Sequence, residues 1–523
     1  MSAAMSYVIG VDIGTQSTKA LVCDAHGHIV AQMSKGYHPD TPRPLWAEQD
    51  AGIWLEATRA CIAGSVERAR AAVPGLEAAD IRSICISSLY GGSGIPVDDD
   101  INPLHPCLIW MDRRAEAEVA WVRQSIDVDG MAEITGNHVD SYYGYTKILW
   151  LKTNRPDVWA RTKYFLPPNA FVIHALTGEI AVDHSSAGNI GGVYDLSRRC
   201  WSEAMLSSLG IPPAMMPERL VHSHDVVGGL KADVAAELGL AAGTPVVAGG
   251  VDAAVATFAA GATRRGQHVA MIGTSMCWGH ITPTVDPASK LVSMPHVFNG
   301  DRDAYVFGGA ITAGASETWF REQFCKADAE EALRSDRDVH AVLDEAAAAL
   351  PAGADGLIFL PYLMGERSPI WDGRASGAFV GLSLYHTRAH AYRAVLEGVA
   401  FALRHNIEAS DTATLDDDLV VVGGAAQSDL WLQIIADITG RRVLTIAENV
   451  EAAMGAALLA ALGAGLVSPQ QAADGWVTLA VSAEPRARER HAYDASFAVY
   501  RSLYPTLKDG MHRLRAMAEA PHP

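Results

Sequence analysis

The stretch that decides the fold is Tyr7-Val-Ile-Gly-Val-Asp-Ile-Gly14, followed directly by Thr15-Gln-Ser-Thr-Lys19. An apolar run that ends in a polar turn is typical of a buried strand. A second strand is expected over 19–24, and the turn at His26-Gly-His28 leads to a third over 29–33. The chain is therefore predicted to open with an antiparallel meander whose first strand ends near Asp12.

Strand and helix patterns alternate beyond this meander. Helical spacing covers 50–73, 113–125 and 145–153, and a short apolar strand covers 84–87. Roughly the last 30 residues are predicted as a helix, whose aromatic stripe from Tyr493 to Tyr504 favours core packing. This alternation indicates an α/β architecture.

Near the middle of the chain the pattern restarts. An apolar strand over 245–252 ends in two glycines and a carboxylate, and the strand over 268–275 again delivers glycine and hydroxyl residues into a turn. A third strand over 419–425 ends in a glycine turn before a predicted helix over 428–439. These restarts predict a duplicated α/β unit, with its second copy starting near residue 260.

The composition limits the choice of partner. A length of 523 residues suggests two to four domains, and 49% hydrophobic with 19% charged residues indicates a large buried core. The formal net charge of −19 disfavours a nucleic acid or an anionic membrane surface as partner. We therefore expect small-molecule chemistry, with no nucleic acid and no membrane.

Cysteine usage and the apolar segments indicate a soluble, cytoplasmic protein. The seven cysteines are widely spread and form no Cys-x-x-Cys pair, so neither a zinc site nor a disulfide framework is expected. The start, Met1 to Tyr7, lacks the pattern of a signal peptide. The apolar run Ala452 to Val467 is shorter than the ~18–20 residues that span a bilayer and is predicted as a packed helix.

Two turns that combine glycine with hydroxyl residues, one in each half, are candidate phosphate sites. In Gly14–Lys19, glycine lets backbone N–H groups approach an anion, the hydroxyls add donors and Lys19 adds charge. Asp12 is placed to hold a hydrated Mg²⁺. Gly273–Ser275 is the corresponding turn of the second half. Each fits an ordinary turn when taken alone, but the pair would clamp a polyphosphate from both sides.

Two further glycine turns lie at strand ends. Asp252 follows Gly249-Gly250 and is placed either as a general base or as the N-cap of the next helix, and the two roles can coexist. Gly423-Gly424 precedes a helix and suits either nucleotide contact or a tight turn. No Walker A loop and no Rossmann glycine fingerprint are present, so nicotinamide chemistry is not expected.

These motifs, in this order, resemble the FGGY carbohydrate kinases, which belong to the actin/hexokinase/heat-shock ATPase superfold. The other matching stretches are 44–50, 108–114, 142–150, 313–316, 360–369, 377–382, and 390–397. Those over 44–50 and 366–369 are most similar to xylulokinases. The resemblance implies two ribonuclease-H-like domains flanking a deep cleft, with residues 1–259 binding the sugar and 260–523 binding most of the nucleotide. It also allows a homodimer.

The implied reaction is ATP- and Mg²⁺-dependent phosphorylation of a hydroxyl of a small sugar or polyol, with a ketopentose such as xylulose as the expected substrate. Glycerol, erythritol and ribulose are alternatives, as is a non-catalytic ATPase or sugar sensor. Asp252 is the expected base and Asp12 orients the hydrated metal. The nucleotide is assigned to Gly14, Thr15, Ser17, Lys19, Gly273, Thr274, Ser275, Gly314, Gly423, Gly424 and Ser428. The sugar is assigned to Leu89, Tyr90, Trp110, Asp112 and Tyr142.

The chain departs from the family pattern at three places. Two lie in the region that contacts the sugar, and the third lies in the first signature motif of the family. Where xylulokinases carry Gly-Gln-Met-His-Gly, this chain has Ser87-Ser-Leu-Tyr-Gly91. Met111 stands where Asn is usual, and Gly144 stands where Pro, Ser or Thr is expected. A pocket with Leu89 and Tyr90 in place of Met-His is predicted to favour a hydroxyl pattern other than that of D-xylulose.

Overall fold

The predicted opening meander lies within a six-stranded sheet in the computed structural model, which describes residues 6–447 and 451–519. In spatial order the strands are β13 (Val226–Gly229), β14 (Pro245–Val247), β5 (Ile81–Ser88), β1 (Tyr7–Ile13), β2 (Ser17–Asp24) and β3 (Ile29–Gly36). β1, β2 and β3 run antiparallel, whereas β5 pairs parallel with both β1 and β14. The apolar residues of β1 are almost fully buried, which explains why this strand was recognisable from sequence.

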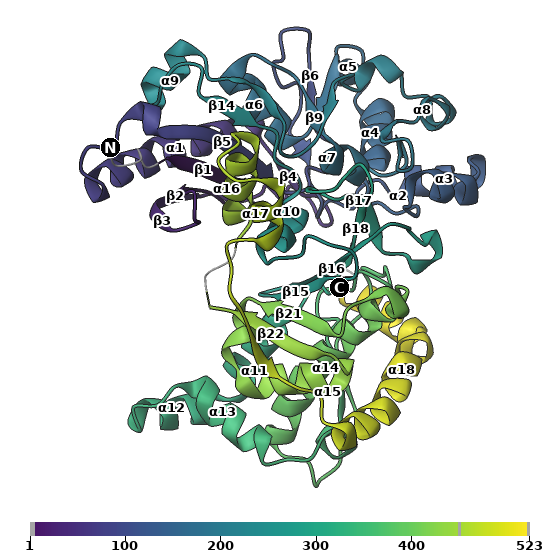
Figure 1. Ribbon diagram of the computed structural model, residues 1–523. Coiled ribbons are helices and arrows are strands. Elements are labelled where there is room, and N and C mark those ends of the chain that lie inside the picture. Colours follow the sequence, from purple (N-terminus) through teal and green to yellow (C-terminus); the bar gives the residue numbers. More distant parts are fainter. Residues whose placement is uncertain (1–5, 448–450, 520–523) are drawn as a thin grey trace.

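A second, seven-stranded sheet repeats this plan. Its order is β17 (Val292–Pro295), β18 (Ala304–Gly308), β16 (Met276–Thr282), β15 (His268–Ile272), β21 (Asp418–Val422), β22 (Arg442–Ile446) and β23 (Leu479–Ala483). β15 pairs antiparallel with β16 and parallel with β21, as β1 does with β2 and β5. The predicted duplication and the two-domain α/β fold are confirmed, and Figure 1 shows the two domains one above the other.

Helices cover these sheets. In the first domain they are α1 (Ala51–Ala72), α2 (Glu116–Ser125), α3 (Val128–Thr135), α4 (Gly144–Asn154), α5 (Pro156–Trp159), α6 (Pro168–Thr177), α7 (His184–Asn189), α8 (Glu203–Leu209), α9 (Ala232–Leu238) and α10 (Asp252–Ala259). The later ones are α11 (Gly314–Phe324), α12 (Lys326–Arg334), α13 (Val339–Ala348), α14 (Arg388–Ile407), α15 (Asp429–Thr439), α16 (Ala452–Gly463), α17 (Pro469–Asp474) and α18 (Ala487–Glu519). Short two-stranded pairs join β4 (Glu48–Gln49) to β7 (Cys107–Leu108), β6 (Ile95–Val97) to β8 (Tyr164–Leu166), β9 (Val182–Asp183) to β12 (Leu220–Val221), β10 (Tyr194–Asp195) to β11 (Cys200–Trp201), and β19 (Ile358–Leu360) to β20 (Ala378–Val380).

Two predicted elements are shorter than expected. The helix expected over 113–125 begins only at Glu116, because Asp112 accepts the backbone N–H of Arg114 and so forms a turn there. The strand expected over 245–252 ends at Val247, where the chain turns through Gly249 toward α10. Both differences come from turns that local hydrophobicity does not reveal.

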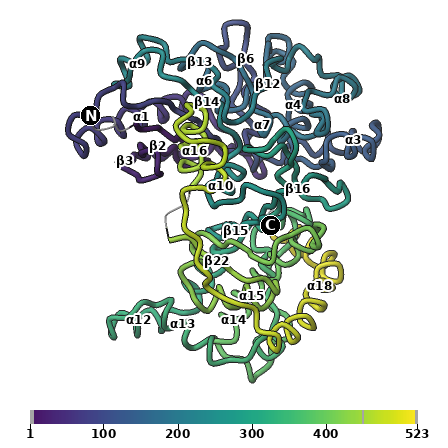
Figure 2. The backbone as a smooth tube through the Cα atoms, viewed as in Figure 1, coloured from purple at the N-terminus to yellow at the C-terminus, as the bar shows by residue number. Residues whose placement is uncertain are grey.

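The chain returns to the first domain near its C-terminus. The apolar run predicted as a packed helix forms α16, which lies against β1 and α10 rather than in the second domain (Figure 2). A Cβ atom on Gly10 would come within 1.9 Å of the Ala453 carbonyl oxygen, so glycine permits this close contact. The Ser83 hydroxyl also donates to the Ala460 carbonyl oxygen at 2.8 Å. The domain boundary expected at 259/260 stays a prediction. Beyond it in sequence, α16 nevertheless packs on the first domain.

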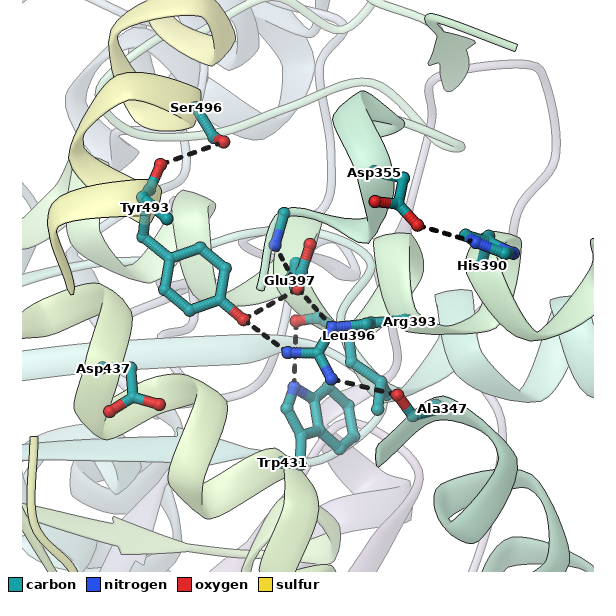
Figure 3. A network of polar contacts seen from close by, with 12 residues as sticks. Ala347, Asp355, His390, Arg393, Leu396, Glu397, Trp431, Asp437, Tyr493 and Ser496 are labelled. Atoms are coloured by element: carbon teal, nitrogen blue, oxygen red, sulfur yellow. Dashed lines mark hydrogen bonds and ion pairs between the residues drawn. The ribbon is translucent and has the colours of Figure 1, made fainter. Parts of the chain in front are cut away.

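A buried polar network connects the C-terminal helix α18 to α14 of the second domain, where Arg393 donates to the Tyr493 hydroxyl (Figure 3). Arg393 and Glu397 of α14 form an ion pair at 2.7 Å, and the Tyr493 hydroxyl donates to Glu397 at the same distance. Arg393 also donates to the Ala347 carbonyl oxygen of α13. The family-like stretch 390–397 therefore includes residues that organise the core of this domain, and the predicted packing role of the stripe that begins at Tyr493 is confirmed.

The seven cysteines are free in this structure, and most are buried. Among the described residues, no helix has the length and apolar character needed to cross a membrane. The interpretation of the N-terminus concerns Met1 to Tyr7, of which Met1 to Met5 lie outside the described residues.

We expect Gly10→Ala to lower the free energy of unfolding by about 3 kcal/mol, because the added methyl group overlaps backbone atoms of α16. Thermal and urea unfolding measure this change. Gly510→Ala is the control, because a Cβ there meets no atom within 4 Å and alanine favours the surrounding helix. Unchanged stability in Gly10→Ala would show that β1 and α16 separate without cost.

Candidate active site

Asp12 lies near the end of β1, beside residues from two neighbouring strands. Ser87 of β5 donates from its hydroxyl to Asp12 Oδ1 at 3.0 Å. Lys19 stands opposite Asp12 on β2, and its Nζ forms an ion pair with Glu451 Oε2 at 2.6 Å. The predicted phosphate ligand Lys19 therefore already has a carboxylate partner, supplied by the residue that precedes α16.

The turn between β1 and β2 is held from several sides. The Gly14 N–H donates to the Ser17 carbonyl oxygen at 2.9 Å, and the Tyr37 hydroxyl donates to the Gly14 carbonyl oxygen at 2.7 Å. Trp110 Nε1 donates to Thr15 Oγ1 at 3.0 Å. The hydroxyl proton of Thr15 stays available for an anion, so the predicted phosphate turn and the predicted sugar residue Trp110 meet at one point.

The corresponding turn of the second domain gathers three predicted glycine sites. The Gly273 N–H donates to the Ser275 carbonyl oxygen at 3.0 Å, and Gly273 in turn accepts from the Gly314 N–H at 2.9 Å. Gly423 has φ 93°, and a Cβ there would lie 2.6 Å from the Ile272 carbonyl oxygen. Thr274 and Ser275 are exposed, so these three loops form one surface with free donors.

Ser428 has a structural role at the start of α15. Its hydroxyl oxygen accepts the Trp431 N–H at 3.0 Å, which caps the helix, and it donates to Asp344 at 2.6 Å. Gly424 begins the short turn that leads to this cap. The nucleotide contacts assigned to Gly424 and Ser428 stay predictions.

Asp252 is the first residue of α10, and Val251 occupies the N-cap position. Its Oδ1 accepts the Ala253 N–H at 2.6 Å. The preceding Gly249 has φ 69°, and a Cβ there would lie 1.9 Å from the Ile86 carbonyl oxygen of β5. This close turn places the carboxylate of Asp252 beside that of Asp12. Asp252 occupies the first helical position, not the N-cap position that the sequence allowed as an alternative.

The two carboxyl groups influence each other strongly. Burial, followed by the charge of Asp252, raises the pKa of Asp12 to about 7, although the Ser87 hydrogen bond lowers it. Burial raises the pKa of Asp252 to about 6, whereas the Ala253 N–H and the charge of Arg367 lower it. Glu451 adds further negative charge near Asp12. The site thus concentrates negative charge that a cation would relieve.

These residues fit a hydrated Mg²⁺. Across 6–447 and 451–519, no three His, Cys, Asp or Glu side chains lie close enough to hold a metal by themselves. Mg²⁺ usually keeps several waters and takes one or two carboxylates together with substrate phosphates. Asp12 is the carboxylate that such an ion would use here, and the ion would neutralise phosphate charge.

Aromatic side chains form the expected sugar side. The rings of Tyr90 and Tyr142 lie 5.0 Å apart, and the Tyr90 hydroxyl accepts the N–H of Gly144 at the start of α4. Buried Lys147 donates to the Tyr142 carbonyl oxygen at 2.6 Å, and burial lowers the pKa of this lysine to about 7. Leu89 and Tyr90 line a cavity of about 10 Å³. Tyr90 is therefore held by a backbone N–H as well as by packing.

Asp112 supports the loop that carries Trp110. Its side chain is fully buried, and its Oδ2 accepts the Ala47 N–H at 2.7 Å and Arg114 Nε at 2.8 Å. The guanidinium of Arg114 lies 3.8 Å from the ring centre of Trp46. Asp112 thus has protein donors of its own, and its sugar contact stays a prediction.

Sequence reasoning gave no role to Arg367, which reaches this site from the second domain. Its guanidinium lies 5.7 Å from the ring centre of Trp110, and its charge lowers the pKa of Asp252 and of Tyr142. Arg367 lies in the family-like stretch 360–369, which was the available signal. Tyr37 and Glu451 were also missed, because their partners lie far away in sequence.

Comparison with known proteins agrees with this arrangement. Family models for the FGGY family of carbohydrate kinases match residues 7–259 (N-terminal domain) and 268–464 (C-terminal domain). The chain is 32% identical over 511 residues to a xylulose kinase of Bacillus subtilis (strain 168), covering 97% of this chain and 98% of that protein. A gluconokinase of Bacillus licheniformis is 29% identical over 467 residues, 88% of each chain.

Solved structures give the same result. The ligand-bound xylulose kinase from Lactobacillus acidophilus matches with a TM-score of 0.88 at 26% identity, covering 97% of this chain and 100% of that one. The two family models together span most of the chain, in the order in which the two sheets occur. The chain belongs to the FGGY family of carbohydrate kinases.

Proposed function

We propose that this carbohydrate kinase transfers the γ-phosphoryl group of MgATP to a hydroxyl of a small ketose or polyol, with a ketopentose such as xylulose as the expected class. The observation that carries the proposal is the link between two hydroxyl-bearing turns, one from each domain. Arg367 donates to Met276 beside Gly273–Ser275 and lies over Trp110, which donates to Thr15. The half-buried carboxylates Asp12 and Asp252 lie in the same region. Phosphoryl transfer requires mainly positioning and charge neutralisation, which this set of groups supplies.

Each group has a defined part in the reaction. Asp252 accepts the proton of the acceptor hydroxyl, and its raised pKa suits a base that works near neutral pH. The hydroxyls of Thr15 and Thr274 donate to phosphate oxygens, while Asp12 holds the hydrated Mg²⁺. Trp110 and Tyr142 present apolar ring faces to the C–H groups of the sugar.

The identity of the substrate is the finer part of the proposal. Relatives named xylulose kinase support a ketopentose, and the gluconokinase relative adds a sugar acid to the set that must be tested. Glycerol, erythritol and ribulose complete that set. The homodimer and the cytoplasmic location stay predictions from the sequence.

A substrate screen tests the proposal directly. ADP release is measured with MgATP and a panel of pentuloses, hexuloses, polyols and aldonates, and the phosphorylated product is identified by mass spectrometry. Because polar groups left unpaired in a closed pocket penalise a wrong sugar, we expect one class to exceed the others by about 10²-fold or more in kcat/KM. Absence of sugar-dependent ADP release across the panel would refute the proposal.

We expect Asp252→Asn to lower kcat by roughly 10²–10⁴-fold, because the amide cannot accept the hydroxyl proton. Sugar and MgATP should still bind, as measured by calorimetry. Asp233→Asn is the control, since Asp233 also lies in the first turn of a helix but is exposed on α9. Near-normal turnover in Asp252→Asn would mean that this residue only stabilises α10.

Two threonine variants test the two phosphate turns one at a time. Thr274→Val should weaken MgATP binding by about 1–3 kcal/mol, because a desolvated phosphate oxygen loses one donor. Sugar binding should be unchanged. Thr15→Val should affect both substrates, because Thr15 also accepts from Trp110. Nucleotide titrations and sugar KM values measure the two effects. Unchanged nucleotide kinetics in both variants would exclude the clamp.

Tyr90→Phe tests the sugar pocket. If Tyr90 contacts the substrate, kcat/KM should fall more for the best sugar of the panel than for poor ones. Tyr145→Phe is the matched control, because this buried hydroxyl of the same region has no hydrogen-bond partner among the described residues. An equal fall for all sugars would assign Tyr90 to holding Gly144 alone.

A further inference from the structure

We propose that Arg367 is a catalytic residue that donates from its guanidinium to the phosphoryl group during transfer, so that the second domain contributes charge directly to the reaction. This inference rests on the proposed kinase function and adds to it a residue beyond the two turns and the aspartates. It stands on four observations: how Arg367 is anchored, what it faces, which of its nitrogens is left without a partner, and how space is made for it.

The anchor of Arg367 lies next to the phosphate turn of the second domain. Its Nη2 donates to the carbonyl oxygen of Met276 at 3.1 Å, and Met276 follows Gly273–Ser275 directly. Its backbone N–H donates at 2.8 Å to Glu366 Oε1, which also accepts the Ile311 N–H. The side chain is thereby held beside the turn that is expected to contact the phosphates.

The opposite side of the guanidinium faces the first domain. The 5.7 Å contact with the Trp110 ring places it over the residue whose Nε1 donates to Thr15 of the other phosphate turn. Its charge also lowers the pKa of Asp252. Arg367 therefore lies between the turn at Gly273–Ser275 and Trp110, which contacts the other phosphate turn, and its charge acts on the expected base.

The guanidinium is incompletely satisfied. Nε is buried and has no hydrogen-bond partner among the described residues, which is costly for a charged donor. The neighbouring backbone is shaped around the group, since a Cβ on Gly309 would lie 2.6 Å from Nη2. The Arg367 guanidinium is thus held in place and has a donor without an acceptor, so it is suited to bind a phosphate group of the nucleotide.

In the transfer step the sugar oxygen forms a new bond to the γ-phosphorus while the bond from this phosphorus to the oxygen that bridges to the β-phosphorus breaks. The bridging electron pair leaves with ADP, and the hydroxyl proton passes to Asp252. Charge on the equatorial oxygens must be balanced throughout, and a positioned arginine acts on such charge in related phosphoryl transfers. Arg367 supplies this balance between the base and the turn at Gly273–Ser275.

The first experiment does not depend on knowing the sugar. Calorimetry measures MgADP binding with and without aluminium fluoride, which imitates the transferring phosphoryl group. We expect wild type to bind MgADP more tightly with aluminium fluoride, and Arg367→Met to lose about 10-fold or more of this gain while binding MgADP alone normally. Arg367→Lys, which keeps charge without the planar fork, should recover only part of it. Arg374→Met, at an exposed site in the same loop, is the control.

The second experiment uses the best substrate of the panel. Arg367→Met should lower kcat by roughly 10²–10³-fold with sugar KM changed by less than about threefold. Thermal unfolding confirms that each variant is folded. A retained gain from aluminium fluoride, or a loss confined to sugar KM, would overturn the inference. A wild-type gain that depends on Arg367, without turnover of any sugar, would refute the proposed substrate class but would still show that Arg367 binds the phosphoryl group being transferred.

Discussion

The desolvation of two neighbouring carboxyl groups, Asp12 and Asp252, is the constraint on which the site depends. Burial disfavours the charged form of each, and each lies close enough to the other for their ionisation to be linked. Lys19, which stands opposite Asp12 on β2, pairs with Glu451 rather than with Asp12. Partial relief comes from the Ser87 hydroxyl and the charge of Arg367. In the proposed reaction, a metal ion and the acceptor proton would supply the rest. The same unfavourable electrostatics would therefore favour both the proposed metal binding and the proposed proton removal.

Duplication of one α/β unit explains why the charges gather at this place. In each copy a strand ends in a glycine-containing turn, and the Gly14 and Gly273 turns are closed in similar ways by short backbone hydrogen bonds. The copies differ in what they add. The first contributes carboxylates, whereas the second contributes exposed hydroxyls and Arg367. The return of α16 to β1 places Glu451 beside Lys19, so that two distant parts of the chain meet next to the first turn.

Local patterns predicted most of the fold because buried strands and amphipathic helices leave periodic signals. The meander, the duplication and the apolar helix at 452–467 are of this kind. The packing of that helix on the first domain could not be predicted, since it depends on Gly10 admitting a backbone 443 residues away, at Ala453. The same holds for side chains whose partners are distant in sequence. Nothing local shows that Lys19 meets Glu451 or that Arg367 reaches Trp110.

Two of the departures from the family pattern are linked by one contact. Gly144 begins α4, and its N–H is one of the donors that a helix start leaves without an intrahelical partner. Tyr90 supplies the acceptor. A Cβ at residue 144 would lie 1.9 Å from the Gly92 carbonyl oxygen, so glycine also allows the loop of Tyr90 to approach the helix. A change at Tyr90 alone would leave a buried N–H unpaired, and a larger residue at 144 would push the loop away. Tyr90 and Gly144 therefore act as a matched pair, and the shape of this pocket wall depends on both.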